Sequence, residues 1–259
     1  YKLILITLFI LSIIFFFRIR IIKKLFYFFI VLMIVLGLFI FGNYKINQNK
    51  NRLEETNKKI FVKIISPNFK LEYGLSKDKI KERLRKLIRF SDPDKSKQTL
   101  FIWPEGVFSG YSYDEILSFK ELITKNFSKD HLIIFGINKL DLNSGSFYNS
   151  MLVVDNNFQI VQSYNKRKLV PFGEFLPFEK LLNSFGLKKI TEGYGSFVRG
   201  NKNNNLKVGE LNILPLICYE VIFTELVQKS DINTNLIVNI SEDGWFGNSI
   251  GPDQHFAKT

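Results

Sequence analysis

The sequence contains a single cysteine, Cys218, among 259 residues. One cysteine excludes any disulfide bond within the chain. A lone cysteine is more often a small buried apolar side chain than a nucleophile, so its neighbours have to decide between the two. Histidine is also scarce, and the two histidines, His131 and His255, lie far apart in the sequence. This pattern indicates neither a metal site nor an organic cofactor.

Charged residues are nearly absent from the start of the chain. Residues 25–42 carry no charge, and residues 1–17 carry only Lys2. At about 1.5 Å per residue, each run is long enough to cross roughly 30 Å of hydrocarbon. Because a core helix is rarely apolar on every face, we predict two transmembrane helices within residues 1–43. A cleaved signal peptide is the alternative, but two apolar runs without a small-residue cleavage site after Gly42 are not typical of one.

The loop between the two runs, residues 18–24, contains four basic residues. Short loops rich in Lys and Arg remain in the cytoplasm, so the chain after residue 43 is expected on the outer side, which in a bacterium is the periplasm. Residues 44–57 are polar without hydrophobic periodicity and are predicted to form a juxtamembrane linker to one domain over residues 58–259. We interpret the formal charge of +12 as solvated basic faces, with attraction to anionic lipids as the alternative. Nothing resembles a nucleic-acid-binding module.

The remainder of the chain alternates predicted strands with predicted helices, which is typical of an α/β layered fold. Part of the sheet is expected to be antiparallel, because Asp155, Asn156 and Asn157 between two strands are a hairpin signal. The predicted strands are 61–66, 99–103, 131–137, 148–155, 159–164, 213–218 and 235–240, and the predicted helices are 76–90, 114–126 and a helix starting after Glu220.

Three predicted strands end at a reactive side chain: Glu105, Lys166 and Cys218. Functional groups in α/β folds gather at the carboxyl ends of strands. Glu105 would act as general base for the thiol, Lys166 would stabilise the thiolate and an oxyanion, and the N–H of Tyr219 would be a second oxyanion donor. A helix beginning after Cys218 would further stabilise the thiolate. Taken singly, the three are also explained as a surface carboxylate, a solvated strand end and a core side chain.

Four segments change that balance. They read FIWPEG (101–106), YNKRKLVPFGEFLPFE (164–179), LICYE (216–220) and NISEDGWFGNSIGPDQH (239–255). Together they resemble the nitrilase-like catalytic domain of bacterial apolipoprotein N-acyltransferases, from about residue 61 to 256. The resemblance implies an α-β-β-α sandwich after the membrane helices. The chain starts at Tyr1 inside an apolar run and stops at Thr259, before the last strands and final membrane helix of that family, so we expect a fragment lacking both ends.

The resemblance also assigns roles to individual residues. Glu105 matches the general base, Cys218 the nucleophile, and Tyr219 and Glu220 its supporting neighbours. Lys166 matches the catalytic lysine, because it follows Tyr164 by two residues and precedes Glu174 by eight. Glu174 matches a second carboxylate that can pair with Lys166. The nearby Lys168 does not fit this spacing. The chain departs from the family at Glu242, where Asn is usual, at Gly106, where Thr is common, and at Ser66, where Gln is common.

Apolar residues flank the predicted site, in the loop after Glu105 and in the segment after Glu174. We interpret them as a lid for an acyl chain, while burial in an ordinary core is the alternative. The residues predicted to bind substrate are Trp103, Phe108, Phe175, Phe178 and Trp245.

The activity implied by the resemblance is transfer of a fatty acyl chain from a phospholipid to the N-terminal amine of a diacylglyceryl-cysteine apolipoprotein, through a thioester on Cys218. The protein is expected to be a monomer in the bacterial inner membrane, with the catalytic domain facing the periplasm. Two alternatives remain open: a membrane-tethered nitrilase or amidase acting on small substrates, and a non-catalytic binding module on the same scaffold.

Overall fold

The structure is a computed structural model that describes residues 21–54, 60–72, 74–178, 195–201, 205–228 and 230–258. The chain divides into two units, Tyr1–Lys59 and Ile60–Thr259, which are described separately.

The described residues of the first unit form a long helix, α2 (Ile21–Glu54). Its segment Leu25–Gln48 is long and apolar enough to cross a membrane, with a mean hydropathy of 2.8 and none of it buried. The helix continues through residues 44–54, where the sequence predicted a linker. No Gly or Pro interrupts residues 43–54, so a helix already nucleated by the apolar run can propagate into them. The other predicted membrane helix, residues 1–17, lies outside the described residues.

The second unit contains a sheet of five strands in the order β1-β2-β3-β4-β5. The first three strands are parallel, and β4 and β5 are antiparallel additions joined by the predicted hairpin. Asp155 fixes this hairpin by accepting hydrogen bonds from the backbone N–H groups of Asn157 and Gln159. The strands are β1 (Phe61–Ile64), β2 (Thr99–Ile102), β3 (His131–Leu140), β4 (Phe147–Val154) and β5 (Ile160–Asn165).

A second sheet has the order β6-β7-β8, with β7 and β8 parallel and β6 antiparallel to β7. Its strands are β6 (Leu206–Val208), β7 (Leu211–Ile217) and β8 (Leu236–Ile240), of which β6 is absent from the sequence-based prediction. Alternate side chains of the two sheets form one buried cluster, which includes Ile102, Met151, Ile217 and Ile240. The sheets therefore pack face to face, as the two-residue side-chain period of a strand allows.

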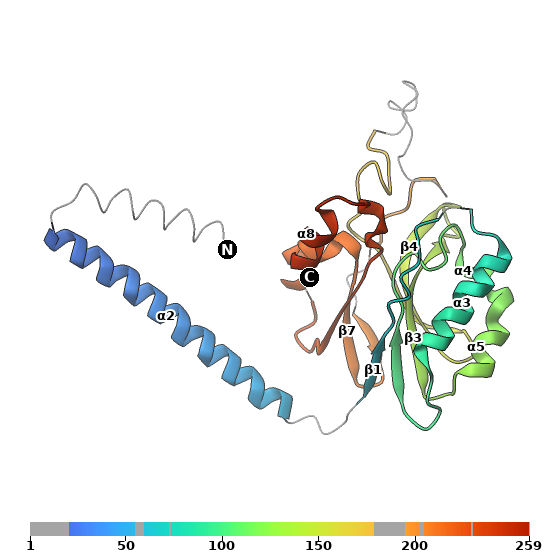
Figure 1. Cartoon of the computed structure of the whole chain (residues 1–259), viewed down its shortest axis with the longest axis horizontal. Coiled ribbons are helices and arrows are strands. Elements are labelled where there is room, and N and C mark those ends of the chain that lie inside the picture. The colour runs from blue at the N-terminus through green and yellow to red at the C-terminus, as the bar shows by residue number, and fades with distance from the viewer. Residues whose placement is uncertain are drawn as a thin grey trace. The chain divides into compact units, whose positions relative to one another are not determined.

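Helices cover the outer faces of both sheets (Figure 1). On the first sheet, α3 (Lys77–Ser91) begins at the predicted cap Ser76. Its apolar side chains belong to the same buried cluster as Phe101 of β2 and Phe135 of β3. The predicted helix 114–126 is broken into α4 (Tyr113–Ile116), the 3₁₀ turn η1 (Leu117–Phe119) and α5 (Lys120–Asn126). On the second sheet, Leu226 of α7 (Thr224–Gln228) packs against Leu214 and Leu216. The described part of the chain thus forms the predicted α-β-β-α layers.

Candidate active site

The cavity of the second unit that contains the predicted triad has a volume of about 370 Å³. Glu105, Lys166 and Cys218 all line it, because the loop after β2, the end of β5 and the end of β7 meet at one edge of the two sheets. Most of the other lining side chains are apolar: Phe108, Ile137, Val170, Pro171, Phe197, Tyr219, Trp245 and Phe246. The structure therefore brings the three reactive groups to one largely apolar pocket.

Cys218 directly follows β7 and adopts a left-handed backbone conformation, with φ of 52°. Its side chain is buried, and burial, together with the negative charge of Glu105, raises the pKa of the thiol to about 12, against the opposing effect of Lys166. The backbone N–H of Tyr219, in the turn that follows, opposes this rise. Only the short 3₁₀ turn η2 (Cys218–Ile222) and the five-residue α7 follow, and these are too short for a strong helix dipole. The thiol needs a base to take its proton.

Glu105 is placed to be that base. Its Oε1 accepts a hydrogen bond of 2.9 Å from the side-chain amide of Asn149. Its Oε2 is buried and accepts no hydrogen bond from the described part of the chain. Burial raises the pKa of Glu105 above its ordinary 4.5, while the positive charge of Lys166 opposes that rise. A carboxylate with a raised pKa and an unused oxygen in a cavity is suited to accept a proton.

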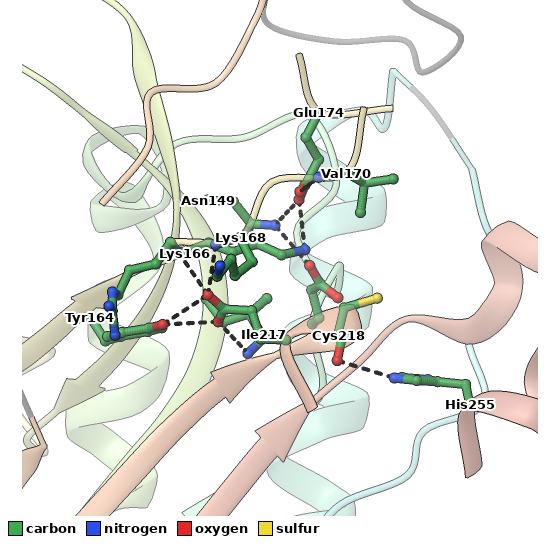
Figure 2. A network of polar contacts seen from close by, with 12 residues as sticks. Asn149, Tyr164, Lys166, Lys168, Val170, Glu174, Ile217, Cys218 and His255 are labelled. Carbon is green, nitrogen blue, oxygen red and sulfur yellow. Dashed lines mark hydrogen bonds and ion pairs between the residues drawn. The ribbon is translucent and has the colours of Figure 1, made fainter. Parts of the chain in front are cut away.

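Lys166 lies within the charge network that connects the two carboxylates with the thiol. Its side chain is 1% exposed, and Nζ donates to Oε1 of Glu174 at 2.9 Å. Burial alone would lower the pKa of Lys166, but the charges of Glu105, Glu174 and Cys218 raise it above 10.5. The side chain is therefore a fixed cation beside the nucleophile. Figure 2 shows Lys166 and Glu174 pointing toward each other above Cys218.

Lys168 lies outside this network. Its Nζ pairs with Glu225 at 2.8 Å on the surface and lies 4.9 Å from the ring centre of Phe223. Residues two apart would share a face within a strand, but β5 ends at Asn165, so that rule does not apply to this pair. The structure thus separates the two lysines as the spacing to Glu174 predicted.

Glu220 connects the lysine segment to the cysteine segment. Its buried carboxylate accepts hydrogen bonds from the hydroxyl of Tyr164 and from the backbone N–H groups of Arg167, Lys168 and Ile217. A single side chain, that of Glu220, therefore holds the residues after Lys166 against the residue before Cys218. Glu220 supports the site by position, and its carboxylate is already fully engaged.

Asn149 was not among the residues singled out from the sequence. Its side-chain amide donates to Glu105 at 2.9 Å and to Glu174 at 2.7 Å, so it joins the two carboxylates on either side of Lys166. The available signal was a polar residue inside the otherwise apolar strand YNSMLVVD. The partners lie 44 and 25 residues away, which is why the sequence alone gave no reason to connect them.

The family model for carbon–nitrogen hydrolases matches residues 76–258, a range that includes Glu105, Lys166 and Cys218. The chain belongs to the carbon–nitrogen hydrolase family. A solved carbon–nitrogen hydrolase from Helicobacter pylori has the same fold, with a TM-score of 0.50 and 15% identity over 77% of this chain and 67% of that one.

Curated relatives with higher identity carry the name apolipoprotein N-acyltransferase. The Bradyrhizobium diazoefficiens protein is 34% identical over 75% of this chain, which covers 38% of that protein's length. The Wigglesworthia glossinidia brevipalpis protein is also 34% identical over 75% of this chain, which covers 40% of it. The chain thus spans well under half the length of the relatives it matches.

Gly106 and Glu242, two positions at which the sequence was expected to depart from the acyltransferase family, lie next to each other. Gly106 has a φ of +73°, and a Cβ atom there would lie 3.1 Å from Cγ of Glu242. Glu242 therefore occupies space that a side chain at position 106 would need. The absence of a side chain at position 106 therefore suits the glutamate at position 242, and neither residue belongs to the triad.

The predicted substrate-binding residues have different environments. Phe108 and Trp245 line the cavity. Trp103 is fully buried against α3, where its indole N–H donates to Ser91, so its predicted role in substrate binding is corrected to one in the core. Phe175 is not a lining residue, and Phe178 is 82% exposed outside the cavity. Phe108 is itself 3% exposed and packs on Phe135, so the loop after Glu105 belongs to the core more than to a mobile lid.

Asn149 gives a testable pH dependence. Glu105 must be ionised to accept the thiol proton, and burial places its pKa above 4.5, so the acid limb of the Cys218 reaction rate lies above that pH. The amide of Asn149 favours the charged carboxylate, so Asn149→Ala should raise the pKa of Glu105 further and move the limb to higher pH. The measurement is the rate of acylation of Cys218 as a function of pH. The control is Asn157→Ala, a variant of an exposed asparagine in the hairpin between β4 and β5. An unmoved limb in Asn149→Ala would contradict the role of Glu105.

Proposed function

We propose that this chain carries the catalytic centre of an apolipoprotein N-acyltransferase, with Cys218 as nucleophile, Glu105 as general base and Lys166 as the fixed cation. The observation that carries the proposal is the meeting of these three side chains in one apolar cavity. The names of the relatives at 34% identity support the acyltransferase activity over simple hydrolysis. The apolar helix α2 supports a membrane location.

The first step forms a thioester. Glu105 takes the thiol proton as the sulfur of Cys218 attacks the ester carbonyl of a phospholipid. Lys166 and the N–H of Tyr219 stabilise the resulting oxyanion. The tetrahedral intermediate collapses by breaking the bond to the glycerol oxygen, which takes the proton back from Glu105. A lysophospholipid leaves, and the acyl group remains on sulfur.

The second step moves the acyl group to nitrogen. The N-terminal amine of the diacylglyceryl-cysteine acceptor attacks the thioester carbonyl and gives one proton to Glu105. Collapse forms the amide and releases the sulfur, which recovers that proton. A thioester is more reactive toward an amine than the original ester, so two moderate barriers replace one large barrier. The apolar lining that includes Phe108 and Trp245 would limit hydrolysis by excluding water.

A transfer assay tests this function against its alternatives. The protein in detergent micelles receives a phospholipid with an isotope-labelled acyl chain and a diacylglyceryl-cysteine peptide. We expect the label on the peptide amine, and none on a matched peptide whose amine is acetylated. Hydrolysis of a small amide such as butyramide without transfer would instead support an amidase. Absence of both activities would support a binding module.

We further propose that the catalytic unit faces the periplasm. The reason is the basic segment 18–24, which contains Arg18, Arg20, Lys23 and Lys24 and should remain in the cytoplasm. The sequence predicted a loop there, but α2 already begins at Ile21, so Lys23 and Lys24 belong to the helix. An epitope tag inserted between α2 and β1 should be labelled by a membrane-impermeant reagent in spheroplasts. A matched tag inserted before Ile21 should be labelled only after lysis, and the reverse pattern would contradict this orientation.

A further inference from the structure

A histidine behind the nucleophile has no role in the steps above. His255 lies on α8 (Gly251–Lys258), a helix that the sequence did not predict, and it is 5% exposed. Its Nε2 lies 3.1 Å from the backbone carbonyl oxygen of Cys218, and its Nδ1 lies 2.8 Å from Oδ1 of Asp243. Figure 2 shows His255 reaching that carbonyl while the sulfur of Cys218 points away from the ring.

A carbonyl oxygen can only accept a hydrogen bond, so the contact with Cys218 requires a proton on Nε2 of His255. The other ring nitrogen, Nδ1, is held by Asp243. Ser241 also donates to Oδ1 of Asp243 at 2.6 Å, which holds the carboxylate in place. The ring of Tyr219 stacks on the imidazole at 5.7 Å with an interplanar angle of 9°. His255 is therefore fixed on both nitrogens and on one face.

The carbonyl that His255 contacts belongs to the same peptide unit as the N–H of Tyr219. In a planar trans peptide the C=O and N–H groups point in opposite directions. The backbone N–H of Tyr219 hydrogen-bonds toward the thiol of Cys218 and favours a lower pKa of that thiol, and both residues line the cavity. Holding the carbonyl from behind thus sets the direction of the N–H in front. A hydrogen bond at the carbonyl also polarises the amide, which makes its N–H a stronger donor.

We infer that His255, held by Asp243, is a positioning residue that aims the Tyr219 N–H at the oxyanion formed during acylation of Cys218. The strained backbone at Cys218, with φ of 52°, needs such support because a non-glycine residue rarely adopts this conformation unaided. The inference rests on the proposed function, since it needs Cys218 to be acylated through a tetrahedral intermediate that carries an oxyanion.

Two reagents distinguish this role from a general structural one. Alkylation of Cys218 by iodoacetamide needs the sulfur but forms no tetrahedral oxyanion. Acylation by p-nitrophenyl butyrate needs the sulfur and also passes through a tetrahedral oxyanion. Both rates are measured on the detergent-solubilised full chain, with release of p-nitrophenol and intact mass as readouts.

The variant His255→Phe keeps the ring that stacks on Tyr219 but removes the donor to the carbonyl. We expect its acylation rate to fall about 10- to 100-fold, while its alkylation rate changes less than about threefold. The loss is smaller than the roughly 100- to 1000-fold for removing an oxyanion donor outright, because the Tyr219 N–H is still present but is no longer held in direction. His255→Gln supplies an amide donor and should recover part of the acylation. Gln254→Ala, the exposed neighbour on α8, should match the unaltered chain in both reactions.

Asp243→Ala provides an independent variant if His255→Phe does not fold, because the Asp243 side chain is 37% exposed. It should lower acylation in the same selective way, by a smaller factor. Equal losses in both reactions, no loss in either, or no recovery in His255→Gln would overturn the inference. An unaltered chain that is alkylated but never acylated would contradict the proposed function itself, and the inference with it.

Discussion

Lys166→Ala should reduce acyl transfer at least about a thousandfold, whereas Lys168→Ala should stay within about twofold of the unaltered chain. Removing the ammonium leaves the carboxylates of Glu105 and Glu174 without the cation that lies beside both. Loss of that charge should raise the pKa of Glu105, so less of the base is ionised, and it removes one oxyanion donor. Lys168 loses only a surface pair with Glu225.

Lys166→Ala can also lower the stability of the fold, because it leaves the carboxylate of Glu174 without its ion pair. Breaking a buried ion pair in this way costs roughly 3–5 kcal/mol of folding free energy, so loss of stability has to be measured separately from loss of catalysis. Lys166→Met, which keeps much of the side-chain volume, should lose activity to the same extent. Thermal unfolding of each variant is measured beside the transfer rate. Equal activity losses in the Lys166 and Lys168 variants, or the larger loss in Lys168→Ala, would reject the assignment of the catalytic lysine.

Cys218→Ala should abolish transfer, with a loss of at least about a thousandfold, because the chain has no other thiol to carry the acyl group as a thioester. Cys218→Ser is a stricter variant, because it keeps the size and the left-handed backbone. A serine hydroxyl is far harder to ionise beside Glu105 than a thiol, so we expect an oxygen ester to form slowly or not at all. Transfer by Cys218→Ala at a rate near that of the unaltered chain would exclude covalent catalysis.

The alternation of strand and helix patterns predicted an α/β fold, and the resemblance of four segments to a known family implied the α-β-β-α layers and the triad. Each strand that ends at Glu105, Lys166 or Cys218 is an apolar run followed by a polar loop, and the carboxyl ends of such strands meet in α/β folds. The spacing of Lys166 to Glu174 was likewise local, and the structure shows the ion pair that it implied.

The parts that the sequence did not reveal depend on contacts between distant residues. Asn149 joins two carboxylates from other segments, and His255 lies 37 residues from the cysteine whose carbonyl it contacts. The prediction of substrate-binding residues was only partly right, because an aromatic residue that is close in sequence to a catalytic side chain can face either side of the sheet. Trp103 follows β2 and faces the helices, although Glu105 two residues later lines the cavity.

The most direct test of the central claim is the mass of the protein after incubation with phospholipid in the absence of any lipoprotein acceptor. The account predicts an added mass equal to one acyl chain, located on Cys218 by peptide mapping and removed by neutral hydroxylamine. It also predicts that adding a diacylglyceryl-cysteine peptide discharges the adduct in a single turnover. A protein that transfers the acyl chain without ever carrying it, at a rate that requires both lipids bound together, would contradict the thioester mechanism.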